Sequence, residues 1–361
     1  MRLKSLKLNN YRNCQDISLD LDYDKIIIVG KNAQGKTNIL ESIYYLSALK
    51  SPRTSNIKDF VKFGENGFNI EGELYKSGTD VSLEIDYTLD KTKVLKLNGL
   101  KTTPKNYKSA LNTVLFSTQD LLLLRGTPQD RRDWLDSAIA QIYPAHDERL
   151  TKYNKIRVQK NNLLKSENID NSLLDVFNEQ IVITGSNIIY TRQKFISELK
   201  KYALEKYSDI STNEKFSFEY SFKHFEIDDI AKALRQELEE RKSEELARHQ
   251  ACVGPHRDDI FFSLDEKDAT KFASQGQHRT VVLALKLGEI DLISSKKGYS
   301  PVLLLDDVLA ELDDLRQNYL LKSISKNTQT IITSVDTLLF EEDFLRNVKI
   351  YTISNGCIAL K

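Results

Sequence analysis

A short segment near the N-terminus has the residue types and spacing that bind nucleotide phosphates. Residues 30–37 read GKNAQGKT and fit the pattern G-x-x-x-x-G-K-T, between a β-branched run at 25–29 and apolar residues at helical spacing. Glycines let the backbone curl so that its N–H groups point at phosphate oxygens, and the start of the following helix adds positive charge there. Lys36 can reach the β and γ phosphates, and the Thr37 hydroxyl can bind Mg²⁺. The pattern predicts an ATP site, with Lys36 also catalytic, formed by Gly30, Lys31, Asn32, Ala33, Gln34, Gly35, Lys36, Thr37 and Asn38.

Two acidic residues follow an apolar run near position 305. Residues 302–305 read VLLL, and Asp306 and Asp307 come directly after them. In P-loop ATPases an acid at the end of such a strand binds Mg²⁺, and a neighbouring group orients the attacking water. We therefore predict that Asp306 binds the metal together with Thr37, and that Asp307 is catalytic. The alternative is an ordinary strand with a solvated acidic end.

A third motif, S-x-G-Q, precedes a helical pattern about 30 residues before the acidic pair. It consists of Ser274, Gly276 and Gln277. In ABC ATPases this signature lies at a helix N-terminus, which is an anion site, and caps the γ-phosphate of ATP bound to the other subunit. We predict that these three residues bind the cofactor. A plain serine N-cap is the alternative. Residues 310–313 fit the loop that follows the acidic pair in these enzymes.

Periodicity predicts an α/β protein of the ABC-type P-loop ATPase head class with an inserted, mostly helical lobe. Helical patterns dominate from residue 127 to about 247, broken by alternating aromatics at 214–222, and Thr127-Pro128-Gln129-Asp130 favours a capped helix start. The helical pattern of this inserted lobe has too many interruptions for a long coiled coil. We expect an ATPase lobe of residues 1–125 and 251–361 around a helical lobe of residues 126–250. Outside that lobe we expect helices at 38–49 and 275–293, an edge strand at 2–8, a turn at Asn98-Gly99, and strands at 25–29, 69–75, 81–88, 94–97, 259–264, 302–305 and 330–333.

Composition limits the partners and the compartment. The 361 residues include 52 basic and 52 acidic side chains, so a strongly basic nucleic-acid-binding surface is not evident from the net charge. A basic run at 149–165 contains Lys152, Lys155 and Lys160, which could share a helix face that contacts DNA phosphates or is simply solvated. Three widely spaced cysteines favour free thiols, and no apolar run approaches the length of a membrane span. These features predict a cytoplasmic protein with no membrane partner.

The motifs and several further segments resemble the RecF family, bacterial DNA-repair ATPases related to SMC heads. The resemblance covers nearly the whole chain and rests on residues 10–13, 37–43, 51–54, 115–121, 131–136, 254–259, 274–279 and 305–313. It implies that Gln119 is the catalytic Q-loop residue, which probes Mg²⁺ and water. Transporter-type ABC proteins carry a histidine after the strand at 330–333. Here Ser334 follows Thr333, so either of these two could sense the γ-phosphate instead.

The resemblance also implies a function in recombinational repair and replication restart. ATP and DNA would drive formation of a homodimer that binds double-stranded DNA and favours single-strand/double-strand gap junctions. The dimer would help mediators resembling RecO and RecR load a recombinase, and slow, DNA-stimulated ATP hydrolysis would release it. Two alternatives remain at this point. One is a transporter-type ABC subunit, and the other is a monomeric P-loop kinase or nucleotide switch.

Overall fold

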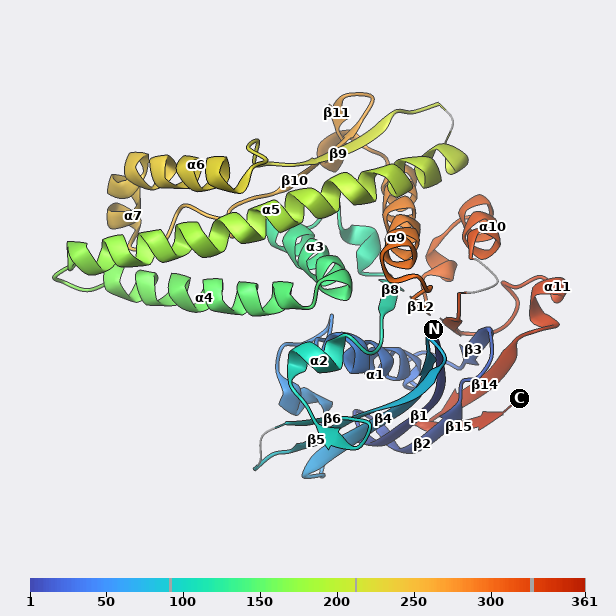
Figure 1. Ribbon diagram of the computed structural model, residues 1–361. Coiled ribbons are helices and arrows are strands. Elements are labelled where there is room, and N and C mark those ends of the chain that lie inside the picture. The colour runs from blue at the N-terminus through green and yellow to red at the C-terminus, as the bar shows by residue number, and fades with distance from the viewer. Residues whose placement is uncertain (91–92, 212, 325–327, 361) are drawn as a thin grey trace. The chain divides into compact units, whose positions relative to one another are not determined.

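The computed structural model describes residues 1–90, 93–211, 213–324 and 328–360. The chain forms two compact units, one of Met1–Leu122 with Arg279–Lys361 and one of Leu123–His278 (Figure 1). The second unit runs past residue 250, where the sequence suggested that the helical lobe would end. The reason is that β9 (Phe216–Tyr220), inside the helical segment, pairs with β10 (Ile260–Leu264), which follows it.

The first unit contains an antiparallel sheet in which strand β1 (Arg2–Tyr11) has a neighbouring strand on each side. The predicted strands at 69–75, 81–88 and 94–97 are confirmed, and Asn98 and Gly99 have the positive φ angles of a tight turn, 52° and 75°. The expectation that the first strand lies at an edge is wrong, because the unpredicted β2 covers it, with Cys14, Ile17 and Leu19 buried. The strand order is β2 (Cys14–Asp20), β1 (Arg2–Tyr11), β4 (Gly67–Lys76), β5 (Thr79–Thr88), β6 (Val94–Leu97) and β7 (Leu100–Lys101).

The second sheet of this unit is mostly parallel and carries the predicted motifs. Its order is β15 (Cys357–Leu360), β14 (Lys349–Ser354), β3 (Lys25–Val29), β13 (Thr330–Ser334), β12 (Val302–Asp306) and β8 (Thr113–Ser117). Among the described strands of this sheet, β15 runs antiparallel to β14 and the other neighbouring pairs are parallel. The carboxyl ends of the parallel strands therefore meet at one edge, where ligands bind in open α/β sheets. The strands predicted at 25–29, 302–305 and 330–333 are confirmed, whereas β8, β14 and β15 were not predicted.

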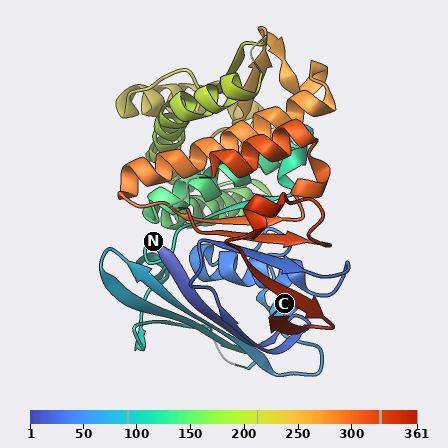
Figure 2. The ribbon, with the colours of Figure 1, turned by 90° about the vertical axis from the view of Figure 1, so that its right-hand side faces the viewer.

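Helix α1 (Lys36–Ala48) lies between the two sheets (Figure 2). Its residues Ile39, Leu40, Ile43 and Leu46 are fully buried and join a core that includes side chains of both sheets. Figure 2 also shows α10 (Asp314–Ser323) on the other side of the parallel sheet from α1. The predicted helix at 275–293 is confirmed as α9 (Gln275–Lys297), and short α2 (Pro104–Lys108) and α11 (Glu342–Leu345) complete the helices of this unit in the described ranges.

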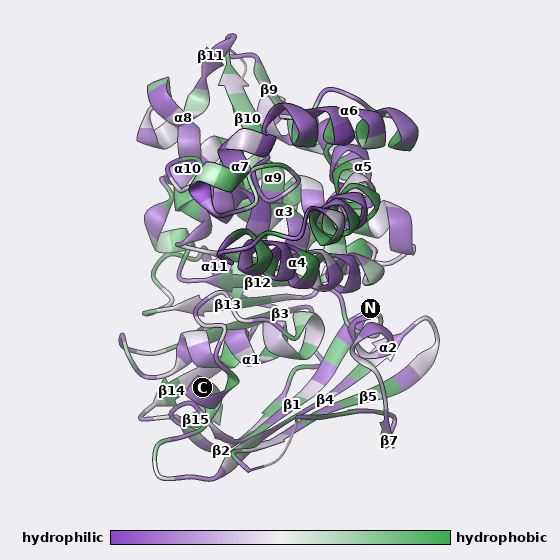
Figure 3. Cartoon of the chain, turned by 90° about the vertical axis from the view of Figure 1, so that its left-hand side faces the viewer, coloured by the Kyte–Doolittle hydropathy of each residue, from purple (hydrophilic) through white to green (hydrophobic). Residues whose placement is uncertain are grey.

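The second unit is built around one helix of 40 residues, α5 (Asn171–Ile210). This helix is longer than the interrupted pattern suggested, and it packs against α4 (Ala145–Leu164) through Tyr153, Ile156, Ile181 and Ile188 (Figure 1). Helix α6 (Ile227–Glu240) turns its hydrophilic side outward in Figure 3. The other elements are α3 (Pro128–Ile142), α7 (Lys242–Arg248), α8 (Ala269–Phe272) and β11 (Lys267–Asp268), which pairs with β10.

Helix α3 begins as the sequence predicts. The Thr127 side chain accepts a hydrogen bond from the backbone N–H of Asp130, and the Asp130 carboxylate accepts one from that of Thr127. This reciprocal capping box, with proline at the first helical position, satisfies donors that a helix start leaves unpaired. Among the described residues no helix has the combined length and apolar character that crossing a bilayer requires.

Two segments that carry the family resemblance outside the nucleotide motifs pair with each other in the second unit. Arg131 of α3 makes two bonds of 2.7 Å to the Asp259 carboxylate. Arg192 of α5 donates to both oxygens of Asp136, at 2.8 and 2.7 Å, and to the backbone oxygen of Pro255. These bidentate pairs satisfy buried charges from α3, α5 and the 254–259 turn. These ion pairs stabilise the second unit, so the residues have a structural role that requires no contact with a ligand.

One member of the basic run is not on the surface. Lys152 and Lys155 are exposed, but Lys160 is fully buried and its Nζ lies 2.5 Å from Glu245 Oε2. The other carboxylate oxygen of Glu245 accepts a hydrogen bond from the Cys252 backbone N–H at 2.8 Å. Burial lowers the pKa of Lys160, while the Glu245 charge opposes that shift. The expectation that Lys160 shares a solvent-facing basic surface is therefore wrong.

We predict that Lys160→Met destabilises the chain by about 3–5 kcal/mol, because it leaves the Glu245 charge buried without its partner. The matched control is Lys155→Met on the exposed side of the same helix, which should change the free energy of unfolding by no more than about 0.5 kcal/mol. Denaturant unfolding of both variants measures the difference. Equal stability of the two variants would show that the buried pair contributes nothing.

Candidate nucleotide-binding site

The loop between β3 and α1 has the shape that its glycines predict. Gly35 has a φ of 111° and Ala33 a φ of 65°, so the backbone turns through the left-handed region before the helix. A Cβ on Gly30 would lie 2.6 Å from the Ile353 carbonyl oxygen, and one on Gly35 would lie 2.7 Å from Asn13 Oδ1. Both positions therefore require glycine. Lys36 is buried at the helix start and its Nζ donates to the Gly30 carbonyl at 2.8 Å.

Two other turns hold this loop from outside. Asn13, in the β1–β2 turn, donates to the Gln34 carbonyl at 3.1 Å and accepts from the Asn38 side chain at 2.8 Å. In the β14–β15 turn, the Asn355 backbone N–H donates to Gln34 Oε1 at 2.6 Å, and that of Gly356 donates to the Gln34 carbonyl at 3.2 Å. The structure thus directs the Gln34 side chain toward the C-terminal hairpin. Sequence reasoning missed Asn13 and Asn355 as supports, since only the folded chain brings them to the loop.

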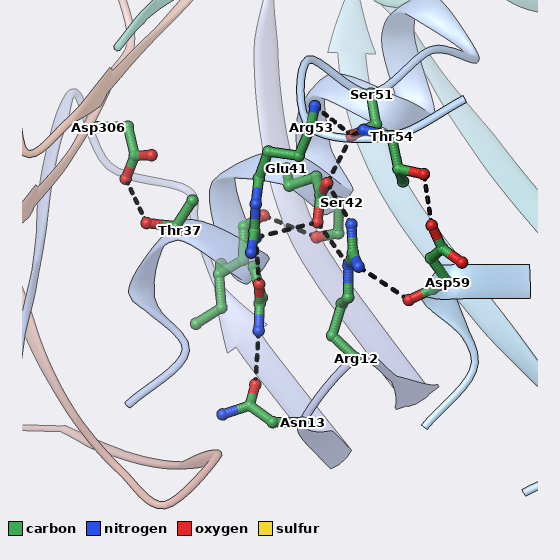
Figure 4. Close-up of polar contacts among 12 residues, drawn as sticks. Arg12, Asn13, Thr37, Glu41, Ser42, Ser51, Arg53, Thr54, Asp59 and Asp306 are labelled. Carbon is green, nitrogen blue, oxygen red and sulfur yellow. Dashed lines mark hydrogen bonds and ion pairs between the residues drawn. The ribbon is translucent and has the colours of Figure 1, made fainter. Parts of the chain in front are cut away.

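The two acids at the end of β12 differ in their surroundings. Thr37 and Thr333 donate their hydroxyls to Asp306 Oδ1, at 3.0 and 2.9 Å (Figure 4 shows the Thr37 contact). Burial and then the neighbouring Asp307 charge raise the pKa of Asp306, although the two hydroxyls oppose the shift. Asp307 has a φ of 51°, its N–H donates to Thr333 Oγ1 at 2.9 Å, and its carboxylate lies 3.7 Å from Lys36 Nζ. The hydroxyl of Thr333, one of the two candidates for the γ-phosphate sensor, is therefore hydrogen-bonded to both Asp306 and Asp307.

Gln119 lies in the exposed loop that follows β8. The next residue, Asp120, fixes this loop, because its carboxylate accepts from the Ser117 N–H and hydroxyl at 2.7 and 2.9 Å and pairs with Lys286 of α9 at 2.7 Å. The buried Lys286 also donates to the Leu115 carbonyl at 2.8 Å. Strand β8 is hydrogen-bonded to β12 in register, with Ser117 opposite Asp306. The fold therefore brings Gln119 to the same edge as the acids.

A charged cluster behind α1 supports the other side of the site (Figure 4). Glu41 is buried and accepts two hydrogen bonds from Arg12, at 2.9 and 2.8 Å, and one from the Ser51 hydroxyl at 2.5 Å. Arg53 donates to Asn38 Oδ1 at 2.6 Å and lies 3.5 Å from Glu41. The Arg12 guanidinium also lies over the Phe60 ring, 5.0 Å from its centroid. Sequence reasoning used these residues only for the family resemblance and missed the cluster.

These parts enclose one cavity of about 530 Å³ within the first unit, a size typical of small-molecule sites. It brings together the predicted residues Gln119, Asp306, Asp307 and most of the loop. Gly30, Lys31 and Gln34 are not among its lining residues, and the Gln34 side chain is directed to the C-terminal hairpin instead. The lining residues are Asn13, Asn32, Ala33, Gly35, Lys36, Thr37, Asn38, Leu40, Glu41, Pro52, Arg53, Leu115, Ser117, Thr118, Gln119, Asp306 and Asp307.

The predicted signature residues belong to the second unit, whereas the residues that line this cavity belong to the first. The Ser274 hydroxyl accepts from the Gln277 backbone N–H at 3.2 Å, and Gln277 Oε1 accepts from the Ser274 N–H at 2.6 Å. This is the reciprocal capping arrangement, here with serine and glutamine. Ser274 is exposed at the start of α9. The serine N-cap interpretation thus describes the contacts inside the chain, and it is compatible with an outward-facing anion site.

We predict that Thr333→Val lowers the free energy of unfolding by about 1–3 kcal/mol, because the Asp306 carboxylate loses a donor and the Asp307 N–H loses its acceptor. Valine keeps the shape of threonine, so packing changes little. Thr352→Val on the exposed face of β14 is the matched control and should be nearly neutral. Denaturant titration of both variants tests this, and a loss no larger than that of the control would contradict it.

Comparison with known proteins agrees with this geometry. The family model for the RecF/RecN/SMC N terminal domain matches residues 2–359. The DNA replication and repair protein RecF of Streptococcus gordonii is 42% identical over 363 residues, covering 99% of this chain and 100% of that protein. The protein of the same name from Natranaerobius thermophilus is 38% identical, covering 99% of this chain and 97% of the other.

Solved structures show the same relationship. One described as the recombination mediator protein RecF-ATP in the RecFOR pathway has a TM-score of 0.91 and 33% identity, covering 100% of this chain and 97% of that chain. An SMC head bound to the C-winged helix domain of ScpA has a TM-score of 0.56 at 15% identity, covering 100% of this chain and 98% of that chain, which shows a shared fold alone. The predicted ABC-type ATPase head is thus confirmed, and the chain belongs to the RecF family.

Proposed function

We propose that this chain is a slow ABC-type ATPase that binds DNA in recombinational repair and replication restart. The observation that carries the proposal is the convergence of the phosphate-loop residues, both acids and Gln119 on one cavity of the first unit. Membership of the RecF family supports the same activity and disfavours a transporter subunit or a monomeric nucleotide switch. The related structure with ATP in its description supports ATP as the nucleotide.

The predicted catalytic residues of the cavity each have a chemical role in this proposal. Lys36 supplies positive charge to the β and γ phosphates, and the backbone of residues 30–37 surrounds them. Asp307 orients the attacking water or accepts its proton, and Gln119 assists at the same position. The Asp307 side chain is shorter than the glutamate usual at this position in transporter-type enzymes. We therefore expect turnover below about one per second, at the low end of typical enzymes.

The Thr37 and Asp306 oxygens fit a Mg²⁺ site. Within the described part of the chain, two threonine hydroxyls and no cationic side chain donate to the Asp306 carboxylate. A hydroxyl and a carboxylate are hard oxygen ligands, and Mg²⁺ completes its shell with water and phosphate oxygens. The bound ion would neutralise the charge of the phosphates during transfer. Thr333 would position both acids, and the Ser334 side chain remains the candidate for a γ-phosphate sensor.

The signature motif requires a second copy of the chain in this proposal. Ser274, Gly276 and Gln277 lie at the start of the 23-residue helix α9, whose N-terminus favours anions, and Ser274 is exposed there. We propose that they contact the γ-phosphate of ATP held by a partner copy. ATP would then hold two copies together, and hydrolysis would release them.

DNA and mediator partners follow from the relatives. We infer that the ATP-bound dimer binds double-stranded DNA, favours single-strand/double-strand junctions at gaps, is stimulated by DNA, and acts with mediators resembling RecO and RecR. The relatives are named DNA replication and repair proteins, and one solved relative is described as a recombination mediator. Lys152 and Lys155 on α4 are exposed and remain candidates for phosphate contacts, whereas Lys160 is not.

We predict that Lys36→Ala loses tight ATP binding and that Asp307→Asn keeps it. The lysine is the cation of the loop, whereas the Asp307 carboxylate would act on water rather than on the phosphates. Asp307→Asn should therefore lower turnover at least tenfold, about 1.4 kcal/mol of barrier, while its ATP affinity stays near that of the wild type. Nucleotide titration and single-turnover hydrolysis measure the two effects. Unchanged ATP affinity in Lys36→Ala would remove the loop from the proposal.

A mixture of two defective variants tests the shared site. Ser274→Arg keeps its own phosphate loop but places a bulky side chain where the partner's γ-phosphate would lie. Lys36→Ala keeps its signature but lacks a usable loop. Each alone should fail to dimerise with ATP, and the mixture should recover part of the association through one sound site. Fluorescence transfer between labelled copies measures it, with Ser274→Ala as the control for side-chain bulk. Strong ATP-driven dimerisation of Ser274→Arg alone would exclude the proposed contact across the dimer.

A further inference from the structure

The side chain of Gln277 is held from two directions within the second unit. Its Oε1 accepts the Ser274 N–H at 2.6 Å, and its Nε2 donates to Glu214 Oε1 at 2.5 Å. A carboxylate can only accept hydrogen bonds, so Glu214 forces the amide nitrogen of Gln277 to face it. The amide oxygen must then face Ser274. The acceptor that caps the start of α9 is thus selected by a residue 63 positions away.

Glu214 is itself fixed by the end of the long helix α5. The Tyr207 hydroxyl donates to Glu214 Oε2 at 2.6 Å, and the Ser211 hydroxyl lies 3.3 Å from the same oxygen. Tyr207 is buried, and its ring lies 4.9 Å from that of Phe216, the first residue of β9. Burial and the Glu214 hydrogen bond raise the pKa of Tyr207, which keeps its hydroxyl a proton donor. The two oxygens of one carboxylate therefore join Tyr207 of α5 to Gln277 of the signature.

We propose that Glu214 is a positioning residue of the signature motif and that, with Tyr207, it links the long helix α5 to the Ser274–Gln277 cap. The role rests on the proposed contact between the signature and a partner's nucleotide. In this arrangement α5, about 60 Å long at 1.5 Å per residue, is hydrogen-bonded through one carboxylate to the residues that would meet phosphate. A shift of the α5 end relative to β9 would change the Glu214 geometry and loosen the cap. Ligands that bind along α5 could in this way alter ATP-dependent association.

The chemistry of the contact explains why a carboxylate stands at position 214. Hydrogen bonds to a charged acceptor are stronger than neutral ones. Glutamine there could still accept from Gln277 through its amide oxygen and donate its NH₂ group to the Tyr207 oxygen, but without the negative charge. Alanine leaves Gln277 without this acceptor, so its amide can flip and turn its nitrogen toward the Ser274 N–H, and two donors then face each other. Loss of Glu214 should therefore open the cap even though Ser274 and Gln277 are unchanged.

Amide hydrogen exchange in the nucleotide-free chain tests the local part of the proposal. Glu214→Ala should speed exchange of the Ser274 and Gln277 backbone N–H groups by about tenfold or more, the equivalent of one charge-assisted hydrogen bond, and Glu214→Gln should have a smaller effect in the same direction. Glu219→Ala on β9 is the matched control, because the Glu219 side chain is 74% exposed and has one lysine contact at 3.4 Å. It should leave both amides unchanged. Wild-type protection in Glu214→Ala would overturn the positioning role.

ATP-dependent dimerisation, followed by light scattering, tests the functional part. Glu214→Ala should need about tenfold more protein to dimerise with ATP, while the affinity of the monomer for ATP stays within about twofold. Tyr207→Phe removes the donor on the α5 side and should weaken dimerisation in the same direction. Wild-type dimerisation by Tyr207→Phe would remove α5 from the link, and wild-type dimerisation by Glu214→Ala would overturn the inference. If the wild-type chain itself does not associate with ATP, the proposed function fails, and amide exchange alone decides the role of Glu214.

Discussion

The hydrogen bonds around the Asp306 carboxylate join three segments that lie far apart in the sequence. Thr37 is the second residue of α1, Thr333 is the last but one of β13, and Asp306 is the last of β12. They meet because β3, β13 and β12 are adjacent and parallel, so that their carboxyl ends lie at one edge. Strand β8 pairs with β12 in the same direction and brings Gln119 to that edge as well. The cavity is therefore a consequence of strand order, and any change of register along β12 would separate its members.

The electrostatics of this edge suit the proposed nucleotide with its divalent cation. Lys36 is 3% exposed and its ammonium donates to a backbone carbonyl, while the Asp307 carboxylate is 3.7 Å away. Asp306 is held by hydroxyls, and burial raises the pKa of its carboxyl group. Burying charges in this way is costly unless opposite charges satisfy them. Phosphate beside Lys36 and Mg²⁺ beside Asp306 would satisfy both, which gives a physical reason for ATP and the metal to bind together.

Sequence patterns were sufficient where a local rule determines the structure. The phosphate loop, the capped start of α3 and the apolar strand before Asp306 all follow from short-range requirements on glycine, caps and burial. Sequence patterns failed where a residue distant in sequence determines the position of a side chain or strand. The charge of Lys160 suggested a surface, but Glu245, 85 residues away, allows it to be buried. Strand β1 was expected at an edge because the weak alternation of β2, with two consecutive exposed residues, concealed its pairing partner. Asn13 and Asn355 support the phosphate loop from two turns, and Glu214 supports the signature from just before β9, but no short-range rule predicts these contacts.

The capped signature of the second unit is compatible with the phosphate contact proposed for it. An N-cap contributes about 1 kcal/mol, whereas hydrogen bonds from a helix start to a charged phosphate are roughly twice as strong as neutral ones. A γ-phosphate presented by another copy could therefore compete for the donors that the Ser274–Gln277 cap occupies. Before a phosphate binds, the cap keeps Ser274 and Gln277 ordered, so that less conformational entropy is lost on binding. The strength of the cap then matters in both directions, because a loose one would leave the motif disordered and a very tight one would resist the phosphate. Glu214 selects the acceptor in that cap, and Tyr207 holds Glu214, so the end of α5 lies where this balance can be adjusted.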